Sequence, residues 1–453
     1  MMSDSHRMTL FGLSQIDKIP QIDKLSEKQR FDLKVVAHVL PFRVNNYVLD
    51  ELIDWNDIPA DPIFQLTFMQ REMLEDEHFD RMASLLKSKA TADQIKAEAN
   101  KIRLELNPHP AGQLNANVPS LDKEPVPGVQ HKYRETCLIF PAGGQTCFSY
   151  CTFCFRWPQF VGLEDLKFVT DEAQRFLTYI KTHKEISDVL ITGGDPMIMS
   201  AKKLEAYMSP MLSEDFDHIK NVRIGTKFLG YWPYRVISDR DSTEILSLFE
   251  RMNAAGKQIS IMAHFNHPRE LETKAVEVAV QKLRNVGCVI RTQSPLLRHI
   301  NDSADLWASM WQRQVQMGMV PYYMFVERDT GPRHYFEIPL AKALEVYREA
   351  IQKTSGLART ARGPSMSCLP GKVCIEGISE IEGKKVFVLS MLQGRNPDWV
   401  KKPFFAKYDE KACWFDDLKP AFDRGGFFFQ RELNEILGFE DSQTLDSKLA
   451  GQC

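Results

Sequence analysis

The chain has 453 residues, 43% hydrophobic and 26% charged, and its net charge of −3 corresponds to a pI near 6.4. This balance excludes the basic field that attracts nucleic acid or anionic lipid, and no apolar run is long enough to cross a bilayer, so we expect neither partner. The N-terminal residues lack the hydrophobic segment of a secretion signal, and nine cysteines, an odd number, do not favour a secreted disulfide framework. We therefore expect a cytoplasmic protein.

Residues 1–120 are predicted to form an N-terminal helical region and a linker. Apolar residues recur at steps of three and four in 26–44 and 64–106, which is the period of a helix. Pro108 and Pro110 then interrupt this pattern, because closely spaced prolines stop helices. The linker continues through 117–120 and 125–128.

From about residue 133, short β-rich runs alternate with amphipathic stretches, which predicts a parallel sheet with helical crossovers. The expected strands are 136–140, 188–192, 221–225, 260–264, 289–293 and 322–326. The expected helices are 171–182, 201–212, 242–255, 271–286 and 304–317. Six such units either close partway into a barrel or lie open as a doubly wound sheet, and in both forms function gathers at the carboxyl ends of the strands.

Three cysteines follow the first of these strands. Cys147, Cys151 and Cys154 have the spacing C-x3-C-x2-C, which suits three corners of a cubane iron–sulfur cluster and leaves one iron open to a substrate. Structural zinc is the alternative, but zinc usually takes four ligands from paired hooks, and no second hook lies nearby. Phe153 is an apolar residue suited to shielding a cluster or a planar ring.

Polar residues follow other strands in the same way. Gly193, Gly194 and Asp195 follow the second strand, where glycines expose the backbone and the carboxylate accepts from an amino group; a tight turn is the alternative. His264 and His267 end the fourth strand, and Gln293 ends the fifth. A single histidine is more often structural than functional, whereas two at one strand end leave a structural role and a functional role equally open.

These motifs together resemble the radical S-adenosylmethionine superfamily and, within it, the lysine 2,3-aminomutase family, over about residues 60–390. The matching segments are the cysteine loop, Thr192-Gly-Gly-Asp-Pro, Val222-Arg-Ile-Gly, His264-Phe-Asn-His-Pro, Gln293-Ser, Leu296-Leu-Arg, Asn301-Asp and Pro321-Tyr-Tyr. The resemblance implies a partial (βα)6 parallel barrel over residues 121–395, with 396–453 as a C-terminal extension. The extension is rich in aromatic residues, and we expect it to pack on the barrel or on a partner subunit.

The resemblance also implies a chemistry and its residues. Cys147, Cys151 and Cys154 would hold a [4Fe-4S] cluster whose open iron binds S-adenosylmethionine, and its one-electron cleavage would give a 5′-deoxyadenosyl radical. Gly193, Gly194 and Asp195 would hold the methionine end, with His264 and Gln293 as further contacts and Phe153 against the adenine. An electron donor such as flavodoxin or ferredoxin, and a homo-oligomer, are expected.

Aminomutases of this family also use pyridoxal phosphate, which forms an imine with a lysine before the substrate enters. The matching lysine is Lys372, after Pro364-Ser-Met-Ser-Cys-Leu-Pro-Gly; its alternative is a solvated lysine after a turn. The family's glycine run is reduced to Pro-Gly here. Where the family has two phosphate-binding arginines, this chain has Lys132 and Thr136, which leaves Lys132 and Arg134 as the candidate phosphate ligands.

The residues that match the family's substrate pocket differ from those of lysine-specific members. Arg156 matches the arginine that binds the amino acid's carboxylate. Arg328 and Ser365 stand where lysine-specific members have aspartates, so an acidic or neutral substrate fits better; a shift of one position would bring in Glu327 or Asp329. Cys368, Cys374, Cys413 and Cys453 are scattered, and no zinc is predicted.

Three hypotheses remain. The first is a radical isomerase that moves an amino group from C2 to C3 of an amino acid other than lysine. The second keeps the radical step without pyridoxal phosphate, as a rearrangement or an elimination. The third, a non-catalytic metal-bound scaffold, requires all of these motifs to be relics.

Overall fold

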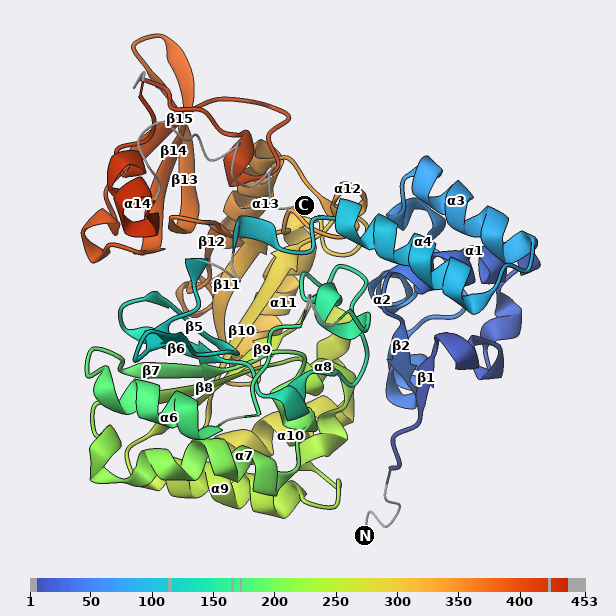
Figure 1. The fold of residues 1–453 in the computed structure, drawn as a ribbon, viewed down its shortest axis with the longest axis horizontal. Helices are drawn as coiled ribbons and strands as arrows, with labels where there is room; N and C mark the ends of the chain where they lie inside the picture. The colour runs from blue at the N-terminus through green and yellow to red at the C-terminus, as the bar shows by residue number, and fades with distance from the viewer. Residues whose placement is uncertain (1–5, 113–115, 164–166, 172, 423–424, 439–453) are drawn as a thin grey trace.

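The computed structural model describes residues 6–112, 116–163, 167–171, 173–422 and 425–438. Within these ranges, one large sheet runs through the molecule in the order β15-β14-β13-β12-β11-β10-β9-β8-β7-β6-β5, and its end strands are not paired with each other (Figure 1). Its strands are β5 (Val129–Tyr133), β6 (Thr136–Ile139), β7 (Asp188–Ile191), β8 (Asn221–Thr226), β9 (Gln258–His264), β10 (Val289–Leu296), β11 (Val320–Val326), β12 (Arg362–Ser367), β13 (Gly371–Ile381), β14 (Lys384–Gly394) and β15 (Phe404–Lys407).

The six strands predicted from the sequence are parallel neighbours, β6 to β11, in chain order. A further strand, β12, is parallel to β11 and was not predicted, and β5, β13, β14 and β15 extend the sheet by antiparallel pairing. The α/β class is therefore confirmed, whereas closure of six units into a partial barrel stays a prediction.

Helices cover one face of the parallel strands. They are α6 (Ala173–Thr182), α7 (Ala201–Met208), α9 (Ser242–Ala254), α10 (Lys274–Asn285), α11 (Ala304–Gln316) and α13 (Leu340–Gln352). The predicted helix at 271–286 begins only at Lys274, because the Thr273 hydroxyl accepts from the Val276 amide at 3.3 Å and caps it. None of the helices in the described ranges has the length and apolar character needed to cross a membrane.

Strand periodicity separates the helix-covered face from the functional face. Val189 and Ile191 of β7 are fully buried, whereas Leu190 between them lies in the wall of a cavity on the opposite face. Leu138 and Arg223 pair with Leu190 in the sheet register and line the same cavity. The alternation of side chains along each strand thus supplies both the hydrophobic core and the floor of the site.

The N-terminal region contains α1 (Glu27–Val39), α2 (Pro62–Thr67), α3 (Asp76–Lys87), α4 (Ala92–Glu105) and the paired strands β1 (Leu10–Gly12) and β2 (Arg43–Asn45). The first helix ends before its predicted limit at 44, because Pro41 has no amide hydrogen and the residue before a proline disfavours helix. The second predicted helix, 64–106, is instead divided among three helices. The short pair β3 (Ser120–Leu121) and β4 (Glu124–Pro125) lies in the linker.

The C-terminal strands and the extension share one hydrophobic cluster. Phe387 and Leu389 of β14 pack in it together with Trp399, Phe404 and Trp414 from beyond residue 395. Helix α14 (Gln430–Leu437) adds Leu433. The aromatic residues of the extension therefore pack against the sheet, and the domain limits at 120 and 395 stay predictions.

Candidate active site

The carboxyl ends of the parallel strands surround a cavity of about 320 Å³. Its wall brings together most of the residues predicted from separate segments: Cys147, Cys151, Phe153, Cys154, Arg156, Gly193, Gly194, Asp195, His264, Gln293, Arg328 and Lys372. Lys132 and Arg134 do not line this cavity. Phe148, Met262 and Phe325 contribute apolar surface between the polar groups.

The N-terminal region holds the cysteine loop in place. Two main-chain groups of α2 accept hydrogen bonds from Thr152: Leu66 O from the amide at 2.9 Å and Gln65 O from the hydroxyl at 2.7 Å. Asn45 Nδ2 of β2 donates to Phe148 O at 3.1 Å, and the main-chain amide of Asn45 donates to the Ser149 hydroxyl oxygen at 3.1 Å. The loop therefore has a fixed backbone before any ligand binds.

The three thiols face the cavity as free cysteines, while the residues between them are buried. Burial raises the pKa of Cys151 to about 11 and that of Cys154 to about 12, so they need a cation to become thiolates. Among the described residues, no group of three or more His, Cys, Asp or Glu side chains converges on a single metal ion. A cubane fits this arrangement better than zinc, because each thiolate binds a different iron.

Local packing explains why two glycines, Gly193 and Gly194, follow β7. An added Cβ on Gly194 would lie 2.5 Å from the main-chain nitrogen and oxygen of Thr146, and Gly193 has φ +141. The absence of side chains lets the loop before Cys147 pack on the strand end, where Asp195 N donates to Thr146 O at 2.7 Å. A contact of these glycines with S-adenosylmethionine stays a prediction.

Asp195 is buried at the centre of the strand ends. Its carboxylate accepts hydrogen bonds from the Met197 amide at 3.0 Å, the Thr226 hydroxyl at 2.6 Å and the Lys227 amide at 2.9 Å. Burial raises its pKa to about 6, and these hydrogen bonds oppose the rise. Because the carboxylate already organises the ends of β7 and β8, only its remaining acceptor capacity is open to a ligand.

His264 and Gln293 are directly paired across neighbouring strands. Gln293 Nε2 lies 2.7 Å from His264 Nε2, and both side chains line the cavity. Burial lowers the pKa of His264 to about 3, and the nearby Lys227 acts in the same direction. The imidazole is therefore neutral at physiological pH and offers a hydrogen bond rather than a charge. His267, by contrast, caps a short turn by accepting from Arg269 N at 3.3 Å.

Lys372 is the second residue of β13, and its amine points at the aromatic floor of the cavity. The Nζ atom lies 4.1 Å from the ring centroid of Tyr323 and 5.6 Å from that of Phe325. Burial lowers the pKa of Lys372 well below its usual range, and the charges of Arg223, Arg362 and Lys132 lower it further. A neutral amine is the nucleophilic form that reacts with a carbonyl group.

The two candidate phosphate ligands, Lys132 and Arg134, lie in different environments. Lys132 donates to Cys368 O, and burial lowers its pKa to about 7. Arg134 is exposed in the turn between β5 and β6 and does not line the cavity, and its phosphate contact stays a prediction. Arg395, which the sequence did not single out, donates to Leu369 O at 2.9 Å, and its charge lowers the pKa of Lys132.

Neither of the two arginines near Phe155 has a carboxylate at hydrogen-bonding distance among the residues that the structure describes. The guanidinium of Arg156 lies 3.9 Å from the Phe140 ring centroid and 5.6 Å from that of Phe155. The guanidinium of Arg328 lies 5.5 Å from the Phe155 centroid and Asp329 Oδ1 is 3.8 Å from its Nε, which is buried and has no hydrogen-bond partner within the described ranges. Burial lowers the pKa of Arg156 to about 9.

Glu327 also lines the cavity, as a one-residue shift of the family match would require. Burial raises its pKa well above the usual range, although Arg328 opposes the rise. A protonated Glu327 brings no negative charge to this end of the cavity. Asp329 does not line the cavity, and Ser365 is buried with its hydroxyl 3.4 Å from Met324 O.

Sequence reasoning gave no role to several residues of this site. Lys227 and Tyr231 line the cavity just after β8, and Arg223 lines it from within that strand. Their position at a strand end was the available signal, since the same rule identified Asp195 and His264. Asn45 had no such signal, because its contact with the cysteine loop spans about a hundred residues of sequence.

No family model matches the chain. A putative L-lysine 2,3-aminomutase of Aquifex aeolicus (strain VF5) is 31% identical over 406 residues, which cover 89% of this chain and 95% of that protein. The chain belongs to the lysine 2,3-aminomutase family. As a member of this family it is a radical S-adenosylmethionine isomerase of the aminomutase type, and a [4Fe-4S] cluster and S-adenosylmethionine are implied as its cofactors.

Two other relatives of this aminomutase-family protein are named for different substrates, lysine and glutamate. The L-lysine 2,3-aminomutase of Clostridium subterminale is 27% identical over 60% of this chain and 62% of that protein. The glutamate 2,3-aminomutase of Clostridioides difficile is 26% identical over 76% of this chain and 70% of that protein. Among solved structures, a radical S-adenosylmethionine methyltransferase, TsrM, of Kitasatospora setae gives a TM-score of only 0.29 at 11% identity, over 42% of this chain and 37% of that one.

Proposed function

We propose that this aminomutase-family protein moves an amino group from C2 to C3 of an amino acid other than lysine, and that it uses pyridoxal phosphate together with S-adenosylmethionine. The observation that carries the proposal is the placement of Lys372, Arg156, Arg328 and the three thiols on the wall of one cavity. When bound, the reduced cluster with S-adenosylmethionine supplies a carbon radical that removes hydrogen from the substrate, and pyridoxal phosphate supplies a carbonyl that holds the amino group.

The thiols would hold the cluster. Cys147, Cys151 and Cys154 are half-buried and line the cavity, which limits the access of water to a reduced cluster. Gly193, Gly194, Asp195, His264 and Gln293 form the adjoining wall, and we propose them as the contacts of S-adenosylmethionine, with Phe153 as an apolar contact.

The residues around Lys372 fit pyridoxal phosphate. Lys372 is held neutral by burial and by neighbouring cations, which prepares its amine to bind a carbonyl. Lys132, Arg223, Arg362 and Arg395 concentrate positive charge nearby, and such a cluster favours a ligand with a phosphate group. We propose Lys372 as the residue that binds the cofactor covalently and Lys132 as a phosphate ligand.

The substrate end of the cavity favours an anionic or neutral polar amino acid. Arg156 would bind the α-carboxylate, and Arg328 would bind the distal group with its unpaired Nε. A distal ammonium would meet the guanidinium of Arg328 and a protonated Glu327, so binding of lysine would be opposed by like charge. The apolar rings of Phe140 and Phe155 hold both guanidinium groups in place without neutralising them.

One observation favours the alternative in which the radical reaction does not use pyridoxal phosphate. Arg134 is exposed to solvent, and Lys132 already donates to a main-chain carbonyl. These two residues therefore offer a phosphate group fewer hydrogen bonds than two arginines would. We further propose a small-molecule substrate, a flavodoxin- or ferredoxin-type reductant, and a homo-oligomer.

The test is an anaerobic product screen. The reconstituted enzyme is incubated with S-adenosylmethionine, pyridoxal phosphate, dithionite and each of a panel of L-amino acids, and β-amino products are detected by NMR. We expect a β-amino acid from a substrate with an acidic or neutral side chain, and none from L-lysine. Conversion of L-lysine alone contradicts the substrate assignment, and cleavage of S-adenosylmethionine with no β-amino product favours the alternative.

A further inference from the structure

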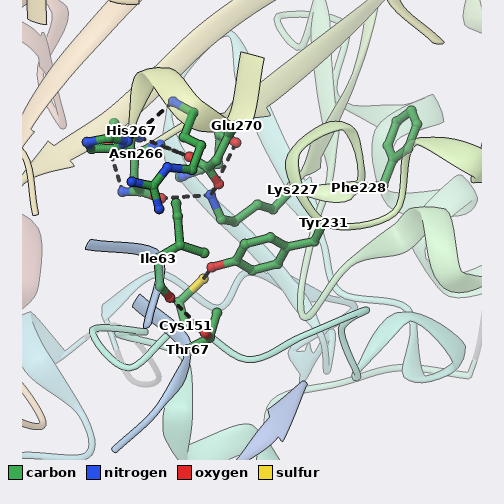
Figure 2. Close-up of polar contacts among 12 residues, drawn as sticks. Ile63, Thr67, Cys151, Lys227, Phe228, Tyr231, Asn266, His267 and Glu270 are labelled. Carbon is green, nitrogen blue, oxygen red and sulfur yellow. Dashed lines mark hydrogen bonds and ion pairs between the residues drawn. The ribbon is translucent and has the colours of Figure 1, made fainter. Parts of the chain in front are cut away.

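Tyr231 directs its phenol at one of the three cysteines of the loop. It ends the short helix α8 (Phe228–Tyr231), is 1% exposed, and its Oη lies 3.5 Å from Cys151 Sγ (Figure 2). Cys151 is the only hydrogen-bond partner of this hydroxyl among the described residues. The phenol is therefore buried, with its hydroxyl next to the sulfur atom of Cys151.

A buried ion pair places a cation over one face of the Tyr231 ring. Lys227 Nζ lies 4.4 Å from the ring centroid, donates to Asn266 Oδ1 at 2.8 Å and pairs with Glu270, which is 0% exposed (Figure 2). Glu270 in turn accepts hydrogen bonds from the Asn266 and His267 amides. The cation is therefore held over the ring, and the ring has one orientation.

We propose that Tyr231 is a positioning residue that sets the reduction potential of the cluster through a hydrogen bond to the Cys151 sulfur. A sulfur bound to iron carries no proton, so the phenol is the only group of this pair that can donate. A donor to a cluster sulfur stabilises the reduced, more negative form, and hydrogen bonds of this kind tune such potentials. The inference rests on the proposed role of Cys151 as a cluster ligand.

The position of Lys227 strengthens this donor. A cation over the face of an aromatic ring draws electron density toward itself, which increases the partial positive charge on the hydroxyl hydrogen. The ion pair with Glu270 also keeps Lys227 from moving toward the sulfur itself. Residues that follow β8 would in this way act on electron transfer without touching the substrate.

The experiment is an EPR-monitored redox titration of the cluster in reconstituted enzyme without substrate. Tyr231→Phe removes only the hydroxyl and keeps the ring over which Lys227 lies. We expect the ratio of reduced to oxidised cluster at a fixed potential to fall by about tenfold, which is a shift of about 59 mV to more negative potential for one electron. The matched control is Tyr234→Phe, whose ring packs on Trp232 and Tyr47 away from the cysteines.

Each outcome decides between a tuning role and a packing role. A potential that is the same in Tyr231→Phe, Tyr234→Phe and the wild type overturns the inference. If Tyr231→Phe binds no cluster, 3-fluorotyrosine at position 231 replaces it, and its stronger donor is expected to shift the potential in the opposite, less negative direction; no shift overturns the inference. A wild-type protein that binds no cluster contradicts the proposed function instead, so the two failures are distinguishable.

Discussion

The side-chain amide of Asn45 donates to the main-chain carbonyl of Phe148, with an Nδ2–O distance of 3.1 Å, and joins the N-terminal region to the cysteine loop. The same Nδ2 donates to Tyr231 O at 2.8 Å, and Oδ1 accepts from the Val48 amide at 3.0 Å. Asn45 is completely buried. One side chain therefore connects β2, the cysteine loop and the helix after β8.

We predict that Asn45→Leu destabilises the protein and lowers its capacity to hold iron. The substitution keeps the number of heavy side-chain atoms but leaves buried polar groups unpaired, at a cost of roughly 1–3 kcal/mol each. The thermal unfolding midpoint and the iron content after reconstitution measure the effect. Asn56→Leu, at an exposed position, is the matched control. Equal midpoints and iron content in both variants would show that the Asn45 contacts do not support the loop.

Cys151→Ala should abolish the cluster chromophore and all cleavage of S-adenosylmethionine, because two thiolates cannot hold a cubane that needs three. Absorbance, iron content and release of 5′-deoxyadenosine measure this. Cys413→Ala, which changes a free cysteine outside the cavity, should leave all three unchanged. An intact chromophore in Cys151→Ala would remove this cysteine from the ligand set.

Lys372→Ala should prevent covalent attachment of pyridoxal phosphate while the cluster still forms, because the two cofactors depend on different residues. Borohydride reduction followed by peptide mass spectrometry measures the pyridoxyl adduct. Lys402→Ala, at an exposed lysine, should keep it. An adduct on another lysine of the wild-type protein would contradict the assignment of Lys372.

The formation of this adduct should depend less steeply on pH between 7 and 9 than adduct formation at an ordinary lysine. Burial lowers the pKa of Lys372 well below its usual range, so a larger fraction of the amine stays in its neutral, reactive form as the pH falls. An ordinary lysine, with a pKa near 10.4, would lose about tenfold of its neutral form for each unit of pH. The initial rate of adduct formation at several pH values distinguishes the two, and a tenfold loss per unit would show that Lys372 is solvated.

Arg328→Asp should shift substrate selectivity toward cationic amino acids by at least about tenfold, since like-charge contacts cost several kcal/mol and the substitution reverses the charge. The ratio of kcat/KM for L-lysine to that for the natural substrate measures the shift. Arg313→Asp, on the surface of α11, controls for general effects of charge. Unchanged selectivity would show that Arg328 does not face the distal group.

The sequence was informative where function follows from the strand order. Cys147, Cys151 and Cys154 and the predicted polar residues after β7 and within β9 and β10 line one cavity, because parallel strands place their carboxyl ends on the same edge. β12 was missed because Gly363 and Pro364 give it no strand pattern. Arg134 is exposed because it lies in the turn between β6 and β5, a strand that the sequence pattern did not predict. The contacts of Asn45 depend on packing between distant segments, which local sequence does not encode.

The most direct test of the account is transfer of deuterium into 5′-deoxyadenosine. The reconstituted enzyme is incubated anaerobically with S-adenosylmethionine, pyridoxal phosphate, dithionite and amino acids deuterated at C3, and the 5′-deoxyadenosine is analysed by mass spectrometry. The account predicts deuterium from an amino acid with an acidic or neutral side chain and none from lysine. Deuterium from lysine alone, or from none of the amino acids while S-adenosylmethionine is cleaved, would contradict it.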